Sequence, residues 1–371
     1  MGIDSASGRY RIGDHVLELR APRLGDADSW RTTNLLHEKR LRPAFGTAMT
    51  DWSTEHSAAA WADRWWRAHT DPFVVHARVL VAEDGPVAHV VGQVDHVGPD
   101  RRTGHVESSI WLAGVPHSTP VSRWALATTV LDVLRTHPEV PRIVAPVYVH
   151  NRPAIALLEA VGFHHVQTLF RLREYAGEPV DHDVFAVENS AASRVELERI
   201  LDALAAQPLP ARRAEKPSVS AAFGAAHLVA RRLRARTTPS RPADPLLPAV
   251  THTADRHTVA FDAGRDARYR VHMDGAPMGD LEVTVDLGTS TTEIIDRLAP
   301  SAVPEVGGVV AAACRAAAAR QRTRRLTIAL ADRHATASQE LVGLGFVSEG
   351  PALPSRGDER TPRESWTRLR E

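Results

Sequence analysis

The sequence predicts an α/β (α+β) protein, with a mixed central sheet flanked by helices and followed by a second, truncated unit. Three observations carry this prediction. Residues 142–163 have the pattern of a strand, a tight turn, a helix and a second strand start. Upstream, three apolar segments separated by turn residues are typical of an antiparallel meander. Downstream, residues 325–346 align with 142–163 without a gap, each position 183 residues after its counterpart, which indicates an internal repeat.

The segment 142–163 can be explained by local physical chemistry. The uninterrupted apolar run Ile143–Val149 predicts a buried strand. Asn151 is a suitable helix N-cap, and Pro153 falls in the first turn, where a missing N–H costs little. Apolar residues at helical spacing follow, and they are Ala154, Leu157, Leu158 and Val161. Gly162 is expected to end the helix in a left-handed conformation.

The N-terminal part is expected to contain one strand and two helices. His15–Leu19 alternates and predicts the first strand. Asp26 can begin a helix that carries Trp30. Residues 41–50 contain proline and glycine without periodicity, so they predict a loop, and the next helix is expected to begin at Ser53.

Five of the eight tryptophans lie between Trp30 and Trp66, which permits two interpretations, an aromatic pocket or ordinary core packing. Trp61 and Trp65 are four residues apart on one helix, where packing into the core is the more ordinary expectation. Trp52 lies on the predicted loop near Arg42, so these two residues are the predicted substrate contacts.

The remaining elements set the domain boundaries. Strands are predicted at 73–82, 87–95 and 105–112, and an amphipathic helix at 193–205 closes the first domain. The predicted domains are therefore 1–205, a Pro/Ala/Arg-rich linker over 206–250, and 251–371. In the last of these, strands at 269–273 and 279–286 and a helix at 309–320 are expected, without an opening strand.

Composition excludes several functional classes. The 371 residues are 43% hydrophobic with a net charge of zero, so packed cores are expected and nucleic acid is an unlikely partner. Cys314 is the only cysteine, which excludes an internal disulfide, and the histidines show no helical pair suited to a metal. No apolar run approaches the length of a membrane span, so we expect a cytoplasmic protein with no membrane partner.

The motif residues resemble those of a known family. Asn151-x-x-Ala154, Leu158-Glu159 and Gly162-Phe163 resemble the cofactor-side motif of the GNAT N-acetyltransferases. The segment 174–188 (EYAGEPVDHDVFAVE) looks like the closing hairpin of the ribosomal-protein N-terminal alanine/serine acetyltransferase branch. The resemblance covers residues 16–188, about half of the chain. It implies the GNAT fold, acetyl-CoA or another acyl-CoA as co-substrate, and an amine as acceptor.

The resemblance also implies a set of site residues. Acetyl-CoA would thread between the strands that end at Leu112 and Val149, and Glu107 would deprotonate the amine as a general base. The implied cofactor-binding residues are Trp111, Leu112, Ser118, Thr119, Val121, Ser122, Arg123, Asn151, Ala154 and Leu158.

Two departures from the family pattern affect the predicted chemistry. In the loop Ala113–Arg123, Pro120 stands where relatives carry a glycine, which removes an N–H donor from the diphosphate site. Thr119 and Pro120 nevertheless form a good helix start, with Thr119 as the expected N-cap. Relatives protonate the leaving thiolate with a tyrosine or serine where this chain has Leu158 and Ala154, neither of which can donate a proton.

Three functions therefore remain open. The first is an acyl-CoA-dependent N-acyltransferase that acts on a protein N-terminus or a small amine. The second is a pseudo-acetyltransferase that binds a ligand or partner without turnover. The third, supported only by the arginines at 231–236, is a transferase that uses aminoacyl-tRNA. In the repeat, His334 replaces the motif asparagine, so cofactor binding is not expected there. The oligomeric state is left open.

Overall fold

The computed structural model divides the chain into two compact units. One comprises Met1–Val166, Glu174–Glu178 and Asp183–Pro239, and the other Gln167–Arg173, Pro179–His182 and Ser240–Glu371. The structure describes residues 8–46, 51–70, 74–84, 87–100, 103–211, 219–237, 247, 249–252, 258–263, 268–286, 291–299, 306–320, 324–354 and 361–369.

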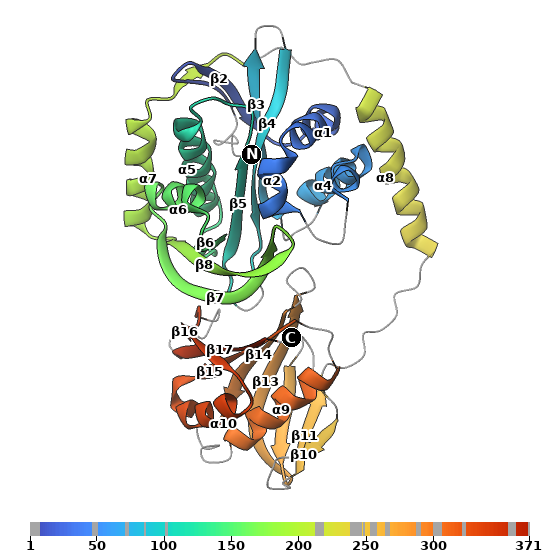
Figure 1. Ribbon diagram of the computed structural model, residues 1–371, viewed down its shortest axis with the longest axis vertical. Helices are drawn as coiled ribbons and strands as arrows, with labels where there is room; N and C mark the ends of the chain where they lie inside the picture. Colours follow the sequence, from blue (N-terminus) through green and yellow to red (C-terminus); the bar gives the residue numbers. More distant parts are fainter. Residues whose placement is uncertain are drawn as a thin grey trace. The chain divides into compact units, whose positions relative to one another are not determined.

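A nine-stranded mixed sheet organises the N-terminal half of the chain (Figure 1). Its strands follow the order β7-β8-β6-β5-β4-β3-β2-β1-β9. The strands are β1 (Gly8–Ile12), β2 (His15–Arg20), β3 (Val74–Asp84), β4 (Val87–Val97), β5 (Val106–Leu112), β6 (Arg142–Tyr148), β7 (His164–Tyr175), β8 (Glu178–Glu188) and β9 (Gln207–Leu209). The helices are η1 (Leu24–Asp26), α1 (Ala27–Leu36), α2 (Glu38–Phe45), α3 (Trp52–Glu55), α4 (Ala58–Thr70), α5 (Thr119–Thr136), α6 (Arg152–Ala160), α7 (Ala191–Ala203) and α8 (Val219–Thr237).

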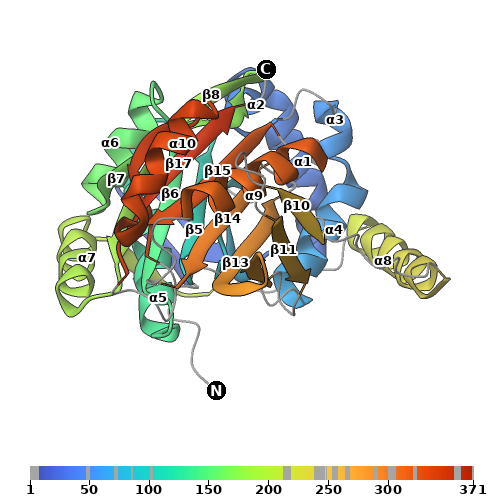
Figure 2. The same ribbon diagram turned by 90° about the horizontal axis from the view of Figure 1, so that it is seen from below.

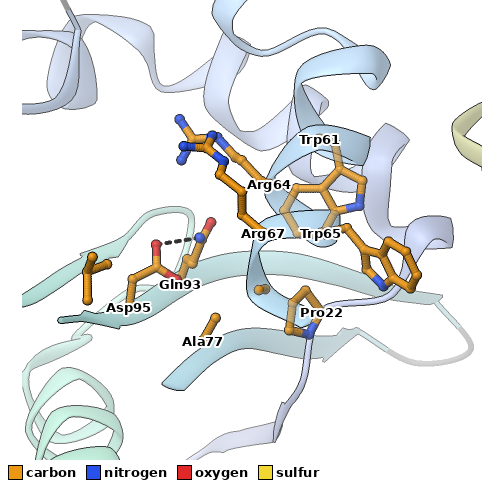
Figure 3. A pocket seen from close by; sticks show the side chains of 10 residues that line it. Pro22, Trp61, Arg64, Trp65, Arg67, Ala77, Gln93 and Asp95 are labelled. Atoms are coloured by element: carbon orange, nitrogen blue, oxygen red, sulfur yellow. Dashed lines mark hydrogen bonds between the residues drawn. The ribbon is translucent and has the colours of Figure 1, made fainter. Parts of the chain in front are cut away.

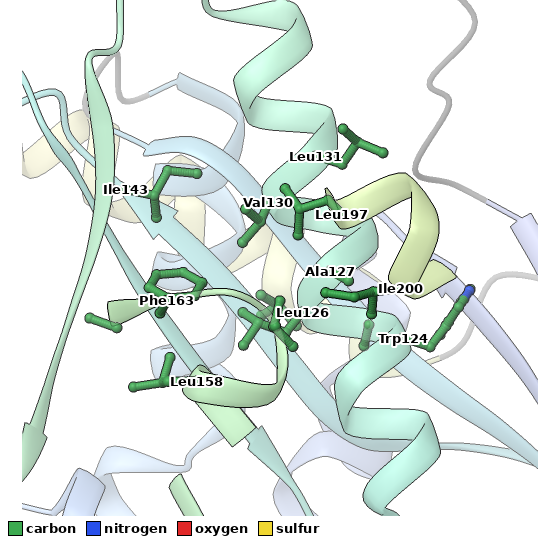
Figure 4. Close-up of a cluster of buried hydrophobic side chains, with 14 of the residues drawn as sticks. Trp124, Leu126, Ala127, Val130, Leu131, Ile143, Leu158, Phe163, Leu197 and Ile200 are labelled. Atoms are coloured by element: carbon green, nitrogen blue, oxygen red, sulfur yellow. The ribbon is translucent and has the colours of Figure 1, made fainter. Parts of the chain in front are cut away.

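Helices cover both faces of this sheet. In Figure 1, α5, α6 and α7 lie on one face, and α1, α2 and α4 lie on the other. The helix α5 is apolar around most of its circumference, as expected for a helix buried between a sheet and another layer. Figure 4 shows its contribution to the main core, in which it meets Ile143 of β6, Leu158 of α6 and Leu197 of α7. Each such fully buried aliphatic side chain contributes roughly 1.5–3 kcal/mol.

Three predictions for the N-terminal part are wrong in detail. The strand expected first is β2, and β1 pairs with it through a tight turn at Gly13, where φ is +56°. Residues 41–45 belong to the helix α2 despite Pro43, because Leu41 is buried and Arg42 forms an ion pair with Glu38 one turn earlier. The expected second helix is split into α3 and α4.

The first unit continues beyond the closing helix α7 into the segment predicted to be a linker. The strand β9 pairs with β1 at the sheet edge. The helix α8 packs on α4 and η1, and a Cβ atom built at Gly224 would lie 3.1 Å from Leu24 Cδ2 and 3.6 Å from Ala62 Cβ. The glycine therefore permits close approach of α8 to α4.

The second unit contains an eight-stranded sheet that repeats the order of the first. The order β10-β11-β12-β13-β14-β15-β17-β16 matches β1-β2-β3-β4-β5-β6-β8-β7 strand by strand. The strands are β10 (Val250–His252), β11 (Thr258–Ala263), β12 (Arg268–Met273), β13 (Ala276–Asp286), β14 (Thr291–Leu298), β15 (Arg325–Ala331), β16 (Val347–Pro351) and β17 (Arg363–Leu369). The helices are α9 (Val306–Arg320), η3 (Asp332–Ala337) and α10 (Ser338–Gly343), and α9 packs on β14 and β15 (Figure 2).

The expectation that this unit lacks an opening strand is wrong. The strands β10 and β11 occupy the places of β1 and β2, but β10 has only three residues, too few to show an alternating pattern. The truncation lies elsewhere. Four residues separate β11 from β12, whereas residues 21–73, with their helices, separate β2 from β3.

A buried polar cluster lies on the α5 face of the first sheet. His76 of β3 and His96 of β4 are 6% and 0% exposed, with ring centroids 5.8 Å apart. His76 Nδ1 lies 3.1 Å from Asp132 Oδ2 of α5, while both ring nitrogens of His96 have no hydrogen-bond partner among the described residues. Burial, and then the charge of Arg78, lowers the pKa of His76 to about 2 and that of His96 to about 3. Both rings are therefore neutral at pH 7, and a neutral His76 can still donate from Nδ1 to Asp132.

Candidate functional site

The strands β5 and β6 are parallel and diverge soon after they begin. They pair at only two positions, Val106 with Ile143 and Glu107 with Val144. On its other side, β5 stays paired with β4 as far as Leu112. The backbone of β5 beyond Glu107 therefore has no strand partner on the β6 side.

Pro146 of β6 lies two residues beyond the last of these pairs. Its nitrogen carries no hydrogen, so β6 cannot donate a ladder hydrogen bond at this point. The corresponding residue in the second unit is Ala329, which pairs with Ile295. In that unit β14 and β15 pair at five positions, from Thr291 with Arg325 onward. The two parallel strands thus separate after fewer paired positions in the first sheet than in the second.

In the second unit, a buried hydrogen bond between His334 and Asp296 connects β14 to the residues after β15. His334, which aligns with Asn151, places its Nδ1 2.5 Å from Asp296 Oδ2, and both side chains are 0% exposed. Asp296 is on β14, and its carboxylate also accepts hydrogen bonds from the N–H groups of Ala331 and Leu298. The carboxylate thereby links β14 to the segment that follows β15, at the end where the first sheet is open.

The loop after β5 leads to the N-terminus of α5. Gly114 has φ of +75° and His117 has φ of +46°, so the chain turns sharply without the glycine-rich sequence of relatives. The N-cap is Ser118 rather than the predicted Thr119, and no side chain caps the helix. Since Pro120 has no N–H, the N–H groups left for an anion at this helix start are those of Thr119 and Val121.

The other residues predicted at this helix start have structural partners. Ser122 donates its N–H to Ser118 O and its hydroxyl to Thr119 O. Val121 is fully buried in the core. Arg123 extends toward α6, where its Nη2 lies 3.4 Å from Ala160 O.

The helix α6 begins as predicted. Asn151 is its N-cap and accepts a hydrogen bond from the N–H of Ala154 at 3.4 Å, and Gly162 follows the helix with φ of +85°. Leu158 is 5% exposed and belongs to the main core, while Ala154 packs against its edge. Neither side chain supplies a proton donor.

One face of the sheet gathers the polar groups next to the divergence. Side chains alternate along a strand, so Glu107, Ser109 and Trp111 of β5 lie on one face. Opposite them on β4 are Val97, Asp95 and Gln93, in that order. This is the face covered by α1 and α4, because Trp111 packs against the cluster that contains Trp30 and Trp61 and against the cluster that contains Leu41 and Trp52. Tyr148 of β6 is on the same face, since the residues that alternate with it, Ile143, Ala145 and Val147, are in the opposite core.

The two predicted substrate residues are not brought together in one pocket. Trp52 begins α3, is 1% exposed, and donates its indole N–H to Asn34 O, so it is a core residue and not a loop residue. Arg42 lines a pocket between α2 and the β7–β8 turn, with Lys39, Ala176 and Gly177 among its neighbours. Its guanidinium forms an ion pair with Glu38 at 2.8 Å.

A pocket of about 200 Å³ lies between α4 and the sheet (Figure 3). Its lining comprises Pro22, Trp61, Arg64, Trp65, Arg67, Ala68, Ala77, Gln93, Asp95 and Val97. Asp95 accepts a hydrogen bond from Gln93 Nε2 at 2.6 Å, and Gln93 Oε1 in turn accepts from Trp30 Nε1 at 3.2 Å. Burial raises the pKa of the Asp95 carboxyl, against the lowering effect of Gln93 and of Arg64 and Arg67.

Sequence reasoning missed the polar residues of this pocket and Tyr148, although it gave an aromatic pocket as one interpretation of the tryptophans that include Trp61 and Trp65. Asp95 and Gln93 alternate on a strand, a pattern also shown by any solvent-facing edge. Their association with Arg64 and Arg67 depends on the packing of α4 on the sheet, which no local pattern encodes. Pro146, an imino acid in an interior strand, was the available signal for the divergence.

The described residues include no group of three or more potential metal ligands. Nor do they include a helix whose length and apolar character would suit it to crossing a membrane.

Part of the chain is similar to known proteins. Residues 19–184 match the family model described as an acetyltransferase (GNAT) domain. No curated protein matches the chain. Among solved structures, Mycobacterium smegmatis RimJ in complex with CoA-disulfide is 25% identical with a TM-score of 0.47, covering 55% of this chain and 96% of its own.

Two further solved structures are similar over about half of the chain. The ribosomal-protein-S5-alanine acetyltransferase of Vibrio fischeri is 17% identical with a TM-score of 0.41, and the alignment covers 47% of this chain and 94% of that one. The spermidine N-acetyltransferase of Vibrio cholerae, in complex with CoA and spermine, is 19% identical with a TM-score of 0.39, with coverages of 48% and 98%.

Proposed function

Residues 19–184 form an acetyltransferase domain of the GNAT family, and on this premise we propose that the protein is an acyl-CoA-dependent N-acyltransferase. The observation that carries the proposal is the divergence of β5 and β6 after Glu107. The exposed backbone of β5 can pair with the extended amide chain of an acyl-CoA as it would with an added strand. The acceptor is a protein N-terminus or a small amine that reaches the face bearing Glu107.

The helix start at Ser118 fits the diphosphate of an acyl-CoA, although with fewer donors than a glycine-rich loop. The N–H groups of Thr119 and Val121 and the hydroxyl of Ser118 belong to the N-terminal end of α5, where the dipole favours anions. Ser122 and Arg123 are engaged within the protein, so we assign them a structural role. The same holds for Val121 and Leu158 side chains, which are in the core.

In the proposed reaction, Glu107 takes a proton from the acceptor amine, directly or through a water molecule. The amine nitrogen attacks the thioester carbonyl carbon, the C–S bond breaks, and the amide and free thiol of CoA are the products. The thiolate needs a proton, and Ala154 and Leu158 cannot supply one. We assign this role to the Tyr148 hydroxyl, because Tyr148 stands on β6 at the divergence and on the same face as Glu107.

Binding of CoA is the first test. At about 100 times its dissociation constant, acetyl-CoA or CoA should stabilise the folded protein by roughly 2.7 kcal/mol, visible as a rise in melting temperature. Ser118→Trp should abolish the rise, because the bulky ring blocks the helix start. The same substitution at exposed Gln339 of α10 serves as the control and should leave the rise unchanged. No rise at millimolar CoA would refute the acyltransferase proposal.

The proton donor is tested by removing one oxygen atom. Tyr148→Phe should lower kcat by a factor of about 10² while leaving the CoA-induced thermal shift intact. Thiol release from acetyl-CoA is measured with the best acceptor from a panel of N-terminal peptides and small amines. The matched control is Tyr175→Phe, because the Tyr175 ring lies 4.4 Å from that of Tyr148. Equal losses in the two variants would show a packing effect and remove Tyr148 from the mechanism.

The alternative of a binding protein without turnover is supported by the lack of a proton donor at two positions, because Ala154 is apolar and Leu158 is apolar and buried. A chain that binds CoA but shows no thiol release with any amine of the panel would favour it. The aminoacyl-tRNA alternative depends on the arginines at 231–236, of which the structure describes the helical backbone but not the side chains.

A further inference from the structure

The pocket between α4 and the sheet is lined by two arginines and one aspartate. Arg64 and Arg67 both line it, and Figure 3 shows their guanidinium groups close together beside Asp95 and Gln93. In the described part of the chain, neither guanidinium has an ion pair or a hydrogen bond with another residue. The one contact of Arg64 with an aromatic ring places its Cζ 5.4 Å from the Trp30 ring centroid.

The two arginines of the pocket repel each other. Burial lowers the pKa of Arg64 most, Asp95 opposes this, Arg67 lowers the pKa further by repulsion, and Glu55 raises it by the smallest effect. Two like charges held close together are unfavourable unless opposite charges compensate them. Among the lining residues Asp95 is the one carboxylate, so within the lining one carboxylate faces two guanidinium groups. An anion between the arginines would relieve their repulsion.

The position of the pocket relates it to the site of acyl transfer. Its floor is on β4, and β4 is paired with β5, which borders the divergence. Asp95 is opposite Ser109, and Val97 is opposite Glu107. Because neighbouring strands lie about 4.7–4.9 Å apart, a group in the pocket is roughly 5–10 Å from an amine at the divergence.

We propose that this pocket binds a carboxylate of the acceptor, and that the acceptor is therefore an amine with a carboxylate roughly 5–10 Å from its amino group. This inference rests on the proposed acyltransferase function and names its substrate class. An acidic side chain on the first or second residue of a peptide spans that distance, because each extended residue adds roughly 3.3–3.6 Å. Trp61 and Trp65 provide apolar walls for the methylene groups of such a side chain. Polyamines, which carry only positive charge, are excluded by Arg64 and Arg67.

Matched peptides test the carboxylate directly. The full-length protein is titrated calorimetrically, with and without CoA, with the tripeptide amides Ser-Glu-Ala and Ser-Gln-Ala, and with free glutamate and glutamine. The glutamyl ligand should bind at least tenfold more tightly than its glutaminyl partner, as expected for a charge-assisted hydrogen bond. Comparison of the peptide pair with the free amino acids separates a protein N-terminus from a small-molecule acceptor.

The variants assign the preference to the pocket. Since Arg64 is half-buried and packs on Trp30, the substitution is made at exposed Arg67. Arg67→Gln should reduce the glutamyl preference to near unity, and Arg40→Gln, at an exposed arginine of α2, should leave it unchanged. Spermidine should not compete with the glutamyl peptide.

Several outcomes would overturn the inference. Equal binding of the two peptides, or a preference that survives Arg67→Gln, removes the carboxylate role of the pocket. Stronger competition by inorganic phosphate than by glutarate at equal ionic strength assigns the pocket to a phosphate instead. If CoA raises the melting temperature but no glutamyl preference exists, this inference fails while the acyltransferase proposal stands. If a glutamyl preference exists but CoA does not raise the melting temperature, the pocket binds a carboxylate while the acyltransferase proposal fails.

Discussion

Lowering the pH from 7 to 5 should cost the first unit about 4 kcal/mol of folding free energy through His76 and His96 alone. The unfolded chain binds a proton at each of these histidines below its ordinary pKa of about 6.5. In the folded state their pKa values are about 2 and about 3, so the rings stay neutral. The unfolded state therefore binds more protons between pH 6.5 and 3, and stability is lost as the pH falls through that range.

Urea unfolding at pH 7, 6 and 5 measures this loss, and His96→Leu isolates its cause. The variant should lose about 2 kcal/mol less than the wild type between pH 7 and 5, because one of the two histidines no longer titrates. At pH 7 it should be at least as stable as the wild type, because both ring nitrogens of His96 are buried without a partner. His164→Leu, at an exposed position of β7, is the control. Parallel pH profiles for wild type and His96→Leu would disprove the assignment.

Removing the imidazole of His334 should destabilise the second unit by about 3–5 kcal/mol, as expected when a buried charge loses its partner. Asp296 is 0% exposed, and in His334→Ala its carboxylate would keep only the N–H groups of Ala331 and Leu298. Since Asp296 joins β14 to the segment after β15, the loss should fall on this unit and spare the first.

Pulse proteolysis across a urea gradient, with fragments assigned by mass, separates the two units. His334→Asn is the conservative variant and should lose less than His334→Ala, because its amide can still donate to Asp296. In a double-mutant cycle, Asp296→Asn combined with His334→Ala should cost less than the sum of the single changes. Additive losses would mean that the two side chains do not interact.

The sequence predicted those parts of the fold that local patterns encode. The N-cap Asn151, the helix α6 and the turn at Gly162 follow from residue types at fixed spacing, and the structure confirms them. The meander β3–β4–β5 follows from apolar runs between turn residues. The repeat of 142–163 at 325–346 correctly indicated a second sheet, but not that this sheet has counterparts of β1 and β2.

Other features depend on contacts between distant segments. The helix α2 contains Pro43, a residue that normally argues against a helix, and it forms because Leu41 is buried against Trp52. Trp52 itself looked like a pocket residue in a loop, yet its indole finds a hydrogen-bond partner in Asn34, 18 residues away. The arginine pocket exists only because α4 lies over β4, an arrangement that no local pattern specifies.

Pro146 of β6 lies beside the part of β5 whose backbone has no strand partner. Past Glu107, β5 is an interior strand with the open backbone of an edge strand, and such edges readily add another strand. The natural competitor for a ligand at this edge is its own neighbour β6, which could close on it as β15 closes on β14. Proline has no N–H, so at Pro146 β6 has no backbone donor to offer if it were to close. The open backbone of β5 is thus available to an extended ligand.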